Sequence, residues 1–272
     1  MKVSSPRARL FAAAVLSILI LSASHAASPA KVDSTCGHEN WGYQESNGPA
    51  RWKDLFPHQC GNGREQSPIN IVNPRTASLP PLQFSYGTVN QLRVENNGHS
   101  IEVTIPSAAP ANRVTLRING VDYRLVRFHF HTRSEHRIAG REEPIELHLV
   151  HEGPGGSSVA VGIFIEPGAA NPALTEVWKH LTAETCRPSW IAALNLAALL
   201  PANLASYRYA GSLTTPTCGQ GLQWCVLKTP VTMTGPQIQA FERIFYGTPL
   251  FPAGNRRPLQ NLNGRVVLTD VR

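Results

Sequence analysis

Apolar and polar residues alternate with a period of two through much of the chain, which is the pattern of strands that bury one face. The clearest runs in the first half are Leu92–Glu95, His99–Ile105 and Val114–Ile118. Asn119-Gly120 follows the last run, and Asn-Gly between two alternating runs predicts a β-hairpin. Further strands are predicted over residues 127–132, 145–151, 158–165, 222–228 and 265–269.

Helical patterns are few and short. They cover residues 173–183, 189–199 and 236–245, and the last segment opens with Thr234-Gly235-Pro236, a typical helix start. No internal repeat, low-complexity segment or linker divides the chain. The pattern therefore predicts a single, mainly β domain, built on one large twisted and mostly antiparallel sheet with short helices at its edges.

The first 26 residues predict a secretory signal. Lys2, Arg7 and Arg9 precede a largely apolar run of twelve residues, Leu10–Leu21, and Ser24-His25-Ala26 forms a small-x-small cleavage site. A membrane anchor is the alternative, but twelve residues are too few to span a bilayer. We therefore expect an exported protein, periplasmic or secreted, with no membrane span after cleavage.

Composition narrows the possible functions. The chain has 272 residues, of which 42% are hydrophobic and 16% are charged, so a folded core is expected. Removing residues 1–26 lowers the formal net charge from +7 to +4, with 22 basic and 18 acidic residues left. No basic run remains, so nucleic acid is not expected as a partner. Residues 27–37 are interpreted as a short lead before a domain at 38–272.

Histidines occupy alternate positions in two predicted strands. His129 and His131 alternate with phenylalanines, so both imidazoles project from one face. Glu146 and His148 share a face of the second strand in the same way. Sixteen residues separate His131 from His148, enough for a hairpin that places the strands side by side. Three imidazoles then converge, with one carboxylate beside the third.

Three neutral histidines can hold a zinc ion and leave the fourth tetrahedral position open, as in catalytic zinc sites. A histidine pair at i and i+2 is, by itself, more often structural. Glu146 strengthens the metal interpretation because a ligating His148 needs an acceptor for its other N–H group. The pattern therefore predicts a catalytic zinc site at His129, His131 and His148.

These motifs resemble those of the alpha-class carbonic anhydrases. Besides F-H-F-H and E-L-H-L-V-H, the resemblance includes Ser134-Glu135-His136 and covers roughly residues 38–272. It implies the same large sheet, a Zn²⁺ cofactor, and the reversible hydration of carbon dioxide to bicarbonate and a proton by zinc-bound hydroxide. Other motifs that carry it are His38-Glu-Asn-Trp-Gly-Tyr43, Gln66-Ser-Pro-Ile-Asn-Ile71, Asn96-Asn-Gly-His99, Gly211-Ser-Leu-Thr-Thr-Pro216 and Asn255-Arg-Arg-Pro258.

The resemblance also implies roles for residues around the zinc. Thr214 and Glu135 would orient the hydroxide, because a threonine hydroxyl can accept one hydrogen bond while it donates another to a carboxylate. His99 would be the proton shuttle, since an imidazole with a pKa near 6.5 passes protons efficiently at neutral pH. Tyr43 and Asn97 would order the intervening water. The expected apolar surface for carbon dioxide comprises Val150, Ala160, Leu213, Leu222 and Trp224, with Thr215 near bicarbonate and Asn255 beside the zinc ligands.

Some of these residues have simpler interpretations. Thr214 is also a reasonable residue for a strand-end turn, Glu135 for a hairpin loop, and His99 for an exposed turn after Asn-Gly. The motif context favours the functional role for all three. His136 and His151 are instead interpreted as core histidines with satisfied hydrogen bonds.

One departure from the family pattern concerns the first zinc ligand. The family usually has glutamine two residues before that ligand, where its carbonyl accepts the ligand's N–H, but this chain has Arg127. Arginine only donates, so His129 loses its acceptor unless water or another carbonyl takes the place of the glutamine. Such losses cost roughly 10–100-fold in metal affinity or activity. Arg127→Gln is accordingly expected to tighten zinc binding. A second departure is Arg133, where similar bacterial proteins commonly have proline; it places a positive charge near the site.

Five cysteines are an odd number for an exported protein, and none has C-x-x-C spacing, so a thiolate zinc site is not expected. The resemblance implies a disulfide between Cys60 and Cys218. Cys225 lies in a strand pattern and is interpreted as a buried free thiol. Whether Cys36 pairs with Cys186 stays open, because the sequence does not fix connectivity.

Two other function classes compete with the enzyme. One is a carbonic-anhydrase-like binding protein without catalysis, although all three zinc histidines are present here; the other is zinc storage or sensing. For the enzyme, the resemblance implies sulfonamide and anion inhibitors and activated esters as side substrates. The sequence leaves monomer and homodimer open.

Overall fold

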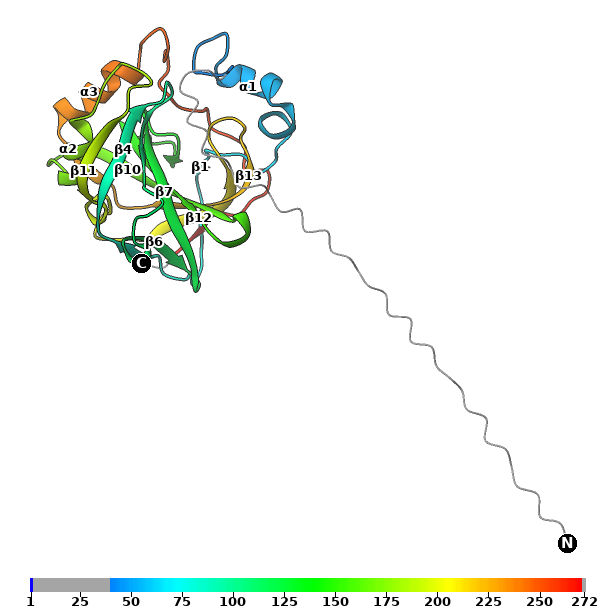
Figure 1. Cartoon of the computed structure of the whole chain (residues 1–272). Helices are drawn as coiled ribbons and strands as arrows, with labels where there is room; N and C mark the ends of the chain where they lie inside the picture. The colour runs from blue at the N-terminus through cyan, green and yellow to red at the C-terminus, as the bar shows by residue number, and fades with distance from the viewer. Residues whose placement is uncertain (2–39, 271–272) are drawn as a thin grey trace.

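The computed structural model of the chain describes Met1 and residues 40–270 (Figure 1). The predicted signal at residues 1–26, the lead at 27–37 and the start of the domain at His38 lie outside the described residues. Among the described residues, no helix has the length and apolar composition needed to cross a membrane.

Thirteen strands of the described residues form one large sheet. Nine of its strand pairs are antiparallel, and three pairs are parallel. The predicted mostly antiparallel sheet is therefore confirmed. Its main path is β11 (Ser189–Asn195), β4 (Thr88–Asn96), β5 (Ile101–Thr104), β7 (Val121–His131), β9 (Ile145–Glu152), β10 (Ser158–Pro167), β13 (Gln220–Leu227), β12 (Ser206–Ser212), β15 (Leu268–Thr269) and β2 (Arg75–Thr76).

Shorter strands complete the arrangement. Off the main path, β3 (Gln83–Tyr86) pairs with β6 (Val114–Ile118), β6 also pairs with β7, and β14 (Val231–Met233) pairs with β10. A separate two-stranded sheet joins β1 (Asn70–Ile71) to β8 (Arg137–Ile138).

The hairpin between β6 and β7 forms where the sequence predicts it. Ile118 and Val121 face each other across the turn, and Asn119 and Gly120 both have positive φ, at 50° and 78°. Two such residues are what a two-residue turn with the twist of the flanking strands requires. The turn therefore fixes the register with which β7 enters the sheet.

Helices cover few of residues 40–270. Helix α3 (Gly235–Phe245) is confirmed, and its start is a capping box in which Thr234 and Gln237 exchange side-chain and backbone hydrogen bonds. Helix α2 (Pro172–Trp178) ends five residues before the predicted 183. The sequence did not indicate α1 (Pro49–Leu55) or the π-helical turn η1 (Pro57–Gly61). Three 3₁₀ turns are η2 (Ala111–Arg113), η3 (Pro154–Gly156) and η4 (Leu196–Leu199).

The helix predicted over residues 189–199 is wrong. Residues Ser189–Asn195 form strand β11 against β4, and only the last four residues turn, as 3₁₀ helix η4. Ile191 and Leu194 are the buried residues of β11. They lie three residues apart because the ladder lacks a pair at Ala192, opposite Gln91, which has a positive φ of 59°. The two buried residues of β11 therefore have the three-residue spacing that is typical of one face of a helix.

The main core lies on the face of β7 that carries its phenylalanines. Phe128 and Phe130 are fully buried there. The ring of Phe130 lies 4.9 Å from that of Trp178 in α2 and 6.0 Å from that of Phe241 in α3. Figure 1 shows α2 and α3 together on one side of the molecule, away from α1. The opposite face of β7 is thus left to its histidines.

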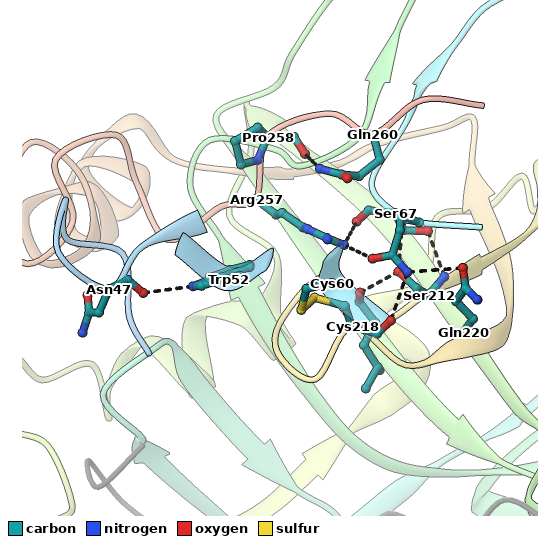
Figure 2. The surroundings of a disulfide bond; sticks show 12 residues. Asn47, Trp52, Cys60, Ser67, Ser212, Cys218, Gln220, Arg257, Pro258 and Gln260 are labelled. Atoms are coloured by element: carbon teal, nitrogen blue, oxygen red, sulfur yellow. Dashed lines mark hydrogen bonds between the residues drawn. A yellow bond between two sulfur atoms is a disulfide. The ribbon is translucent and has the colours of Figure 1, made fainter. Parts of the chain in front are cut away.

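The predicted disulfide between Cys60 and Cys218 is present (Figure 2). It joins residues 158 positions apart and ties η1 to the loop before β13. Arg257 donates to Gln66 Oε1 and to the Ser67 carbonyl beside it. Cys225 is a buried free thiol, as predicted. The possible pairing of Cys36 with Cys186 involves a residue outside the described part of the chain.

Removing this bridge is expected to destabilise the protein markedly. In the chain-entropy account, closing a loop of this length stabilises the folded state by about 4–5 kcal/mol. We therefore expect the double variant Cys60→Ser, Cys218→Ser to lose several kcal/mol in urea unfolding without reductant. Cys225→Ala is the control for removing a thiol, with an expected loss of about 1–2 kcal/mol from its small cavity. Equal losses in the two proteins would contradict a stabilising role for the bridge.

Candidate metal centre

Strands β7 and β9 bring the three predicted histidines together. His129 faces His148 directly in the antiparallel register, and His131 lies two residues further along β7 on the same face. One ligand atom from each ring lies within 4.8 Å of the others. The spacing therefore suits one ion held between two neighbouring strands.

In His131 and His148, hydrogen bonds determine which ring nitrogen carries the proton and which has a lone pair available for a metal ion. His131 Nδ1 lies 2.6 Å from the carbonyl oxygen of Asn255, and His148 Nε2 lies 2.9 Å from Glu146 Oε1. Carbonyl and carboxylate oxygens only accept, so each of these nitrogens carries the proton. His131 Nε2 and His148 Nδ1 are left with free lone pairs. Glu146 and Asn255 thus have the contacts expected of groups that orient metal ligands.

The ring of His129 differs from the other two. Its Nδ1 is buried, and no described residue forms a hydrogen bond with it. Arg127, two residues earlier, forms an ion pair with Glu102, with Nε 3.3 Å from Oε2. The structure therefore agrees with the sequence prediction that His129 has no acceptor at residue 127.

Burial keeps the three histidines neutral. It lowers the pKa of His131 to about 4 and lowers the pKa of His148. The pKa of His129 falls well below 6.5, mainly through burial and further through the neighbouring histidines and Arg127. A neutral imidazole is the form that binds a metal ion. At pH 7 a metal ion would therefore bind these rings without first displacing a proton from an imidazolium.

Glu135 lies next to the free nitrogens. Its Oε2 is 3.5 Å from His131 Nε2 and 3.8 Å from His148 Nδ1, while Oε1 accepts the backbone N–H of Arg257 at 2.7 Å. Burial raises the pKa of Glu135 to about 7, although His148 and the Thr214 hydroxyl lower it in part. Oε2 has no hydrogen-bond partner among the described residues. Thr214 and Glu135 are nonetheless brought together, as the sequence predicts.

Glu146 organises the base of the site. Its Oε2 accepts the backbone N–H groups of Glu135 and His136 at 2.8 Å each, and Oε1 accepts His136 Nδ1 at 2.7 Å. Burial raises its pKa, but the two neighbouring histidines outweigh burial and hold the pKa well below 4.5. His136 Nε2 also meets the Tyr209 hydroxyl at 2.6 Å. His136 is therefore a satisfied core histidine, as interpreted from the sequence.

Three adjacent strands supply the expected apolar surface. Val150 in β9 pairs with Ala160 in β10, and Ala160 pairs with Trp224 in β13. The Trp224 ring lies 4.8 Å from the His148 ring. Ala160, Leu222 and Trp224 belong to one buried cluster, and Leu213 packs against it. Thr215 follows Thr214 and is half-buried.

His99 is less accessible than a turn histidine. Its ring stacks on Trp41 at 3.8 Å with an interplanar angle of 9°. Burial lowers its pKa to about 4. Asn97 Oδ1 accepts the backbone N–H groups of His99 and Ser100, so this amide holds the turn. Tyr43 is buried 6.4 Å from His99, ring to ring.

The sequence analysis gave no role to two residues that contact the predicted site residues, Arg257 and Trp41. Arg257 supports Glu135 through its backbone N–H, and Trp41 covers His99; both lie in quoted motifs, but motif matching gave neither a role. Arg133 lies 3.9 Å from Glu142 Oε1 and over the Tyr246 ring, and it shares Glu142 with Arg137 and Arg256. His151, also interpreted as a core histidine, contacts Tyr86 Oη and the Val159 carbonyl.

Comparisons with known proteins agree on one family. The family model described as eukaryotic-type carbonic anhydrase matches residues 47–271. A carbonic anhydrase of Pectobacterium atrosepticum is 36% identical over 232 residues, which are 84% of this chain and 90% of that protein. The alpha-carbonic anhydrase of Thermovibrio ammonificans, solved with the inhibitor sulfanilamide, is 36% identical with a TM-score of 0.76, over 85% of this chain and all of that one. Dioscorin complexed with ascorbate is 31% identical with a TM-score of 0.76, over 85% of this chain and 98% of that one.

The backbone beside Asn255 admits no side chain. Gly254 has a φ of 89°, and a Cβ there would lie 1.8 Å from the Thr132 carbonyl oxygen. We expect Gly254→Ala to destabilise the protein by about 3–5 kcal/mol, from left-handed strain plus the clash. Gly140→Ala, with a φ of 84° and no atom within 4 Å of the added Cβ, is the matched control at about 1–2 kcal/mol. Urea unfolding compares them, and equal losses would argue against the clash.

Proposed function

The chain belongs to the eukaryotic-type, or alpha-class, carbonic anhydrases, and we propose that it interconverts carbon dioxide and bicarbonate with one zinc ion held by His129, His131 and His148. The arrangement of the three ring nitrogens carries this proposal. The three nitrogens are close enough to share an ion, and the rings are neutral at pH 7. In His131 and His148, a hydrogen bond to the other ring nitrogen leaves the lone pair of the ligand nitrogen free. The site residues therefore fit the metal that the family implies.

The donor set favours zinc over other ions. Three imidazoles suit zinc, whereas calcium and magnesium prefer oxygen ligands. A zinc ion held there supplies a Lewis acid that makes a water molecule nucleophilic near neutral pH. Glu135 accepts from the Thr214 hydroxyl in this proposal, which leaves the lone pairs of that hydroxyl to accept from the attacking water and to orient it.

The apolar surface beside the metal suits carbon dioxide. Val150 and Ala160 face each other across β9 and β10, and Trp224 lies next along the sheet. Carbon dioxide is small and apolar, so burial against these side chains brings it to the oriented water without a competing polar contact. Leu213 and Leu222 complete this surface, and Thr215 would contact the bicarbonate product.

His99 would carry the released proton away. A ring with a pKa of about 4 holds no proton at neutral pH, so we propose that it shuttles protons only when it leaves the stack on Trp41. Away from that stack the ring regains an ordinary pKa near 6.5. Tyr43 and Asn97 would border the water path between His99 and the metal.

Two alternative functions compete with catalysis: ligand binding without hydration activity, and zinc storage. A structural neighbour is described in complex with ascorbate, which keeps open a ligand-binding protein without hydration activity. Zinc storage is the other rival. The sulfanilamide complex of the Thermovibrio protein supports sulfonamides as inhibitors here, and the bacterial relatives are compatible with export after signal cleavage.

The deciding experiment is stopped-flow hydration of carbon dioxide by the oxidised, zinc-loaded protein. Fast hydration blocked by a sulfonamide is expected. Stoichiometric zinc with no hydration above buffer would reject the enzyme and favour a binding or storage role. Ester hydrolysis, measured in parallel, would report the side activity.

The shuttle role predicts a specific kinetic pattern. His99→Ala is expected to lower kcat by about 100-fold or more in dilute buffer with little change in kcat/KM, and added imidazole should restore kcat. The exposed His58, changed to alanine, is the control and should leave kcat unchanged. A His99→Ala protein with undiminished kcat at low buffer concentration would contradict the shuttle.

A further inference from the structure

The buried Nδ1 of His129 poses a chemical problem for the proposed zinc site. If His129 binds zinc through Nε2, its proton must lie on Nδ1, and a buried N–H needs an acceptor. The other two rings have theirs, in the Asn255 carbonyl and Glu146. Nδ1 of His129 has none among the described residues, and Arg127 can only donate.

Glu102 lies where an acceptor is needed. It belongs to β5, next to β7, and is the residue directly opposite His129 in their antiparallel register. Residues opposed in this way project from the same face, with Cβ atoms about 4.5–5.5 Å apart. Glu102 is mostly buried, and its side chain is 17% exposed. A carboxylate at that separation reaches the ring edge directly or through one water.

Arg127 holds this carboxylate. It precedes His129 by two residues, so it projects from the same face of β7, and its Nε lies 3.3 Å from Glu102 Oε2. The pair occupies Oε2 and leaves Oε1 for a second donor. Arg127, Glu102 and His129 therefore form one group across β5 and β7.

We propose that Glu102 accepts the Nδ1–H of His129 in the metal-bound protein, and that Arg127 anchors Glu102 for this purpose. The Arg127–Glu102 pair would then replace the glutamine that the family usually has at residue 127. The inference rests on the proposed zinc site, and it makes Glu102 a positioning residue. It differs from the simpler view, drawn from residue 127 alone, that His129 has no acceptor.

The two views predict opposite effects on zinc affinity, measured by competition with a chelator. If Glu102 is the acceptor, Glu102→Leu weakens zinc binding about 10–100-fold. Arg127→Gln then changes the affinity little, because the new carbonyl replaces the old acceptor. The same Glu102→Leu change has little effect in the Arg127→Gln background. If His129 has no acceptor, Arg127→Gln tightens binding about 10–100-fold and Glu102→Leu changes nothing.

A matched control separates this role from loss of a buried charge. Asp270, directly after β15, is also a mostly buried carboxylate with a cationic partner: its side chain is 14% exposed and its Oδ1 lies 3.4 Å from Lys228 Nζ. Asp270 is remote from β5 and β7 in the sheet order, so Asp270→Leu should leave the zinc dissociation constant within about twofold. Glu102→Gln keeps an accepting oxygen and should restore most of the affinity lost in Glu102→Leu.

A spectroscopic measurement tests the contact without a destabilising variant. In the zinc-loaded protein, the Nδ1 proton of His129 should give a slowly exchanging, downfield NMR signal that moves upfield in Glu102→Gln. An unchanged signal, or equal zinc affinity in wild type and Glu102→Leu, would overturn the proposal. Because zinc alone is the probe, these results do not depend on hydration activity. An inactive protein with the expected affinities would reject the enzyme and keep the role of Glu102.

Discussion

The register between β7 and β9 is the constraint on which the site depends. It places His129 opposite His148, and the period of two along β7 then adds His131 to the same face. A slip of one residue would turn the histidines into the core and expose Phe128 and Phe130. The packing of Phe130 against Trp178 and Phe241 therefore holds the three histidines in place from the other side of the sheet.

Buried carboxylates set the second requirement. Two backbone N–H groups and two histidines stabilise Glu146 as an anion, which offsets the cost of burying its charge. The same hydrogen bonds fix the tautomers of His136 and His148. Glu135 has fewer donors, and burial raises its pKa to about 7. The two carboxylates thus have different environments. Glu146 is held as an anion by its donors, whereas the pKa of Glu135 lies close to neutral pH.

Much of this arrangement could be predicted from the sequence because it is local. Alternation gave the faces of β7 and β9, Asn119-Gly120 gave a turn, and E-x-H placed Glu146 beside His148. Long-range geometry could not be predicted in this way. The break opposite Gln91 made β11 resemble a helix, and the stack of Trp41 on His99 joins segments nearly sixty residues apart.

The surroundings of residue 127 show the same difference between local and long-range information for a single hydrogen bond. The sequence alone shows that arginine cannot accept a proton from His129, since that follows from the chemistry of the side chain. It does not show that Glu102 stands opposite His129, because this depends on how β5 pairs with β7. Arginine in place of glutamine removes an acceptor but adds a cation, and a cation holds a carboxylate more strongly than a neutral amide does. The residue on the neighbouring strand therefore decides whether a departure from the family pattern loses the hydrogen-bond acceptor or replaces it with another.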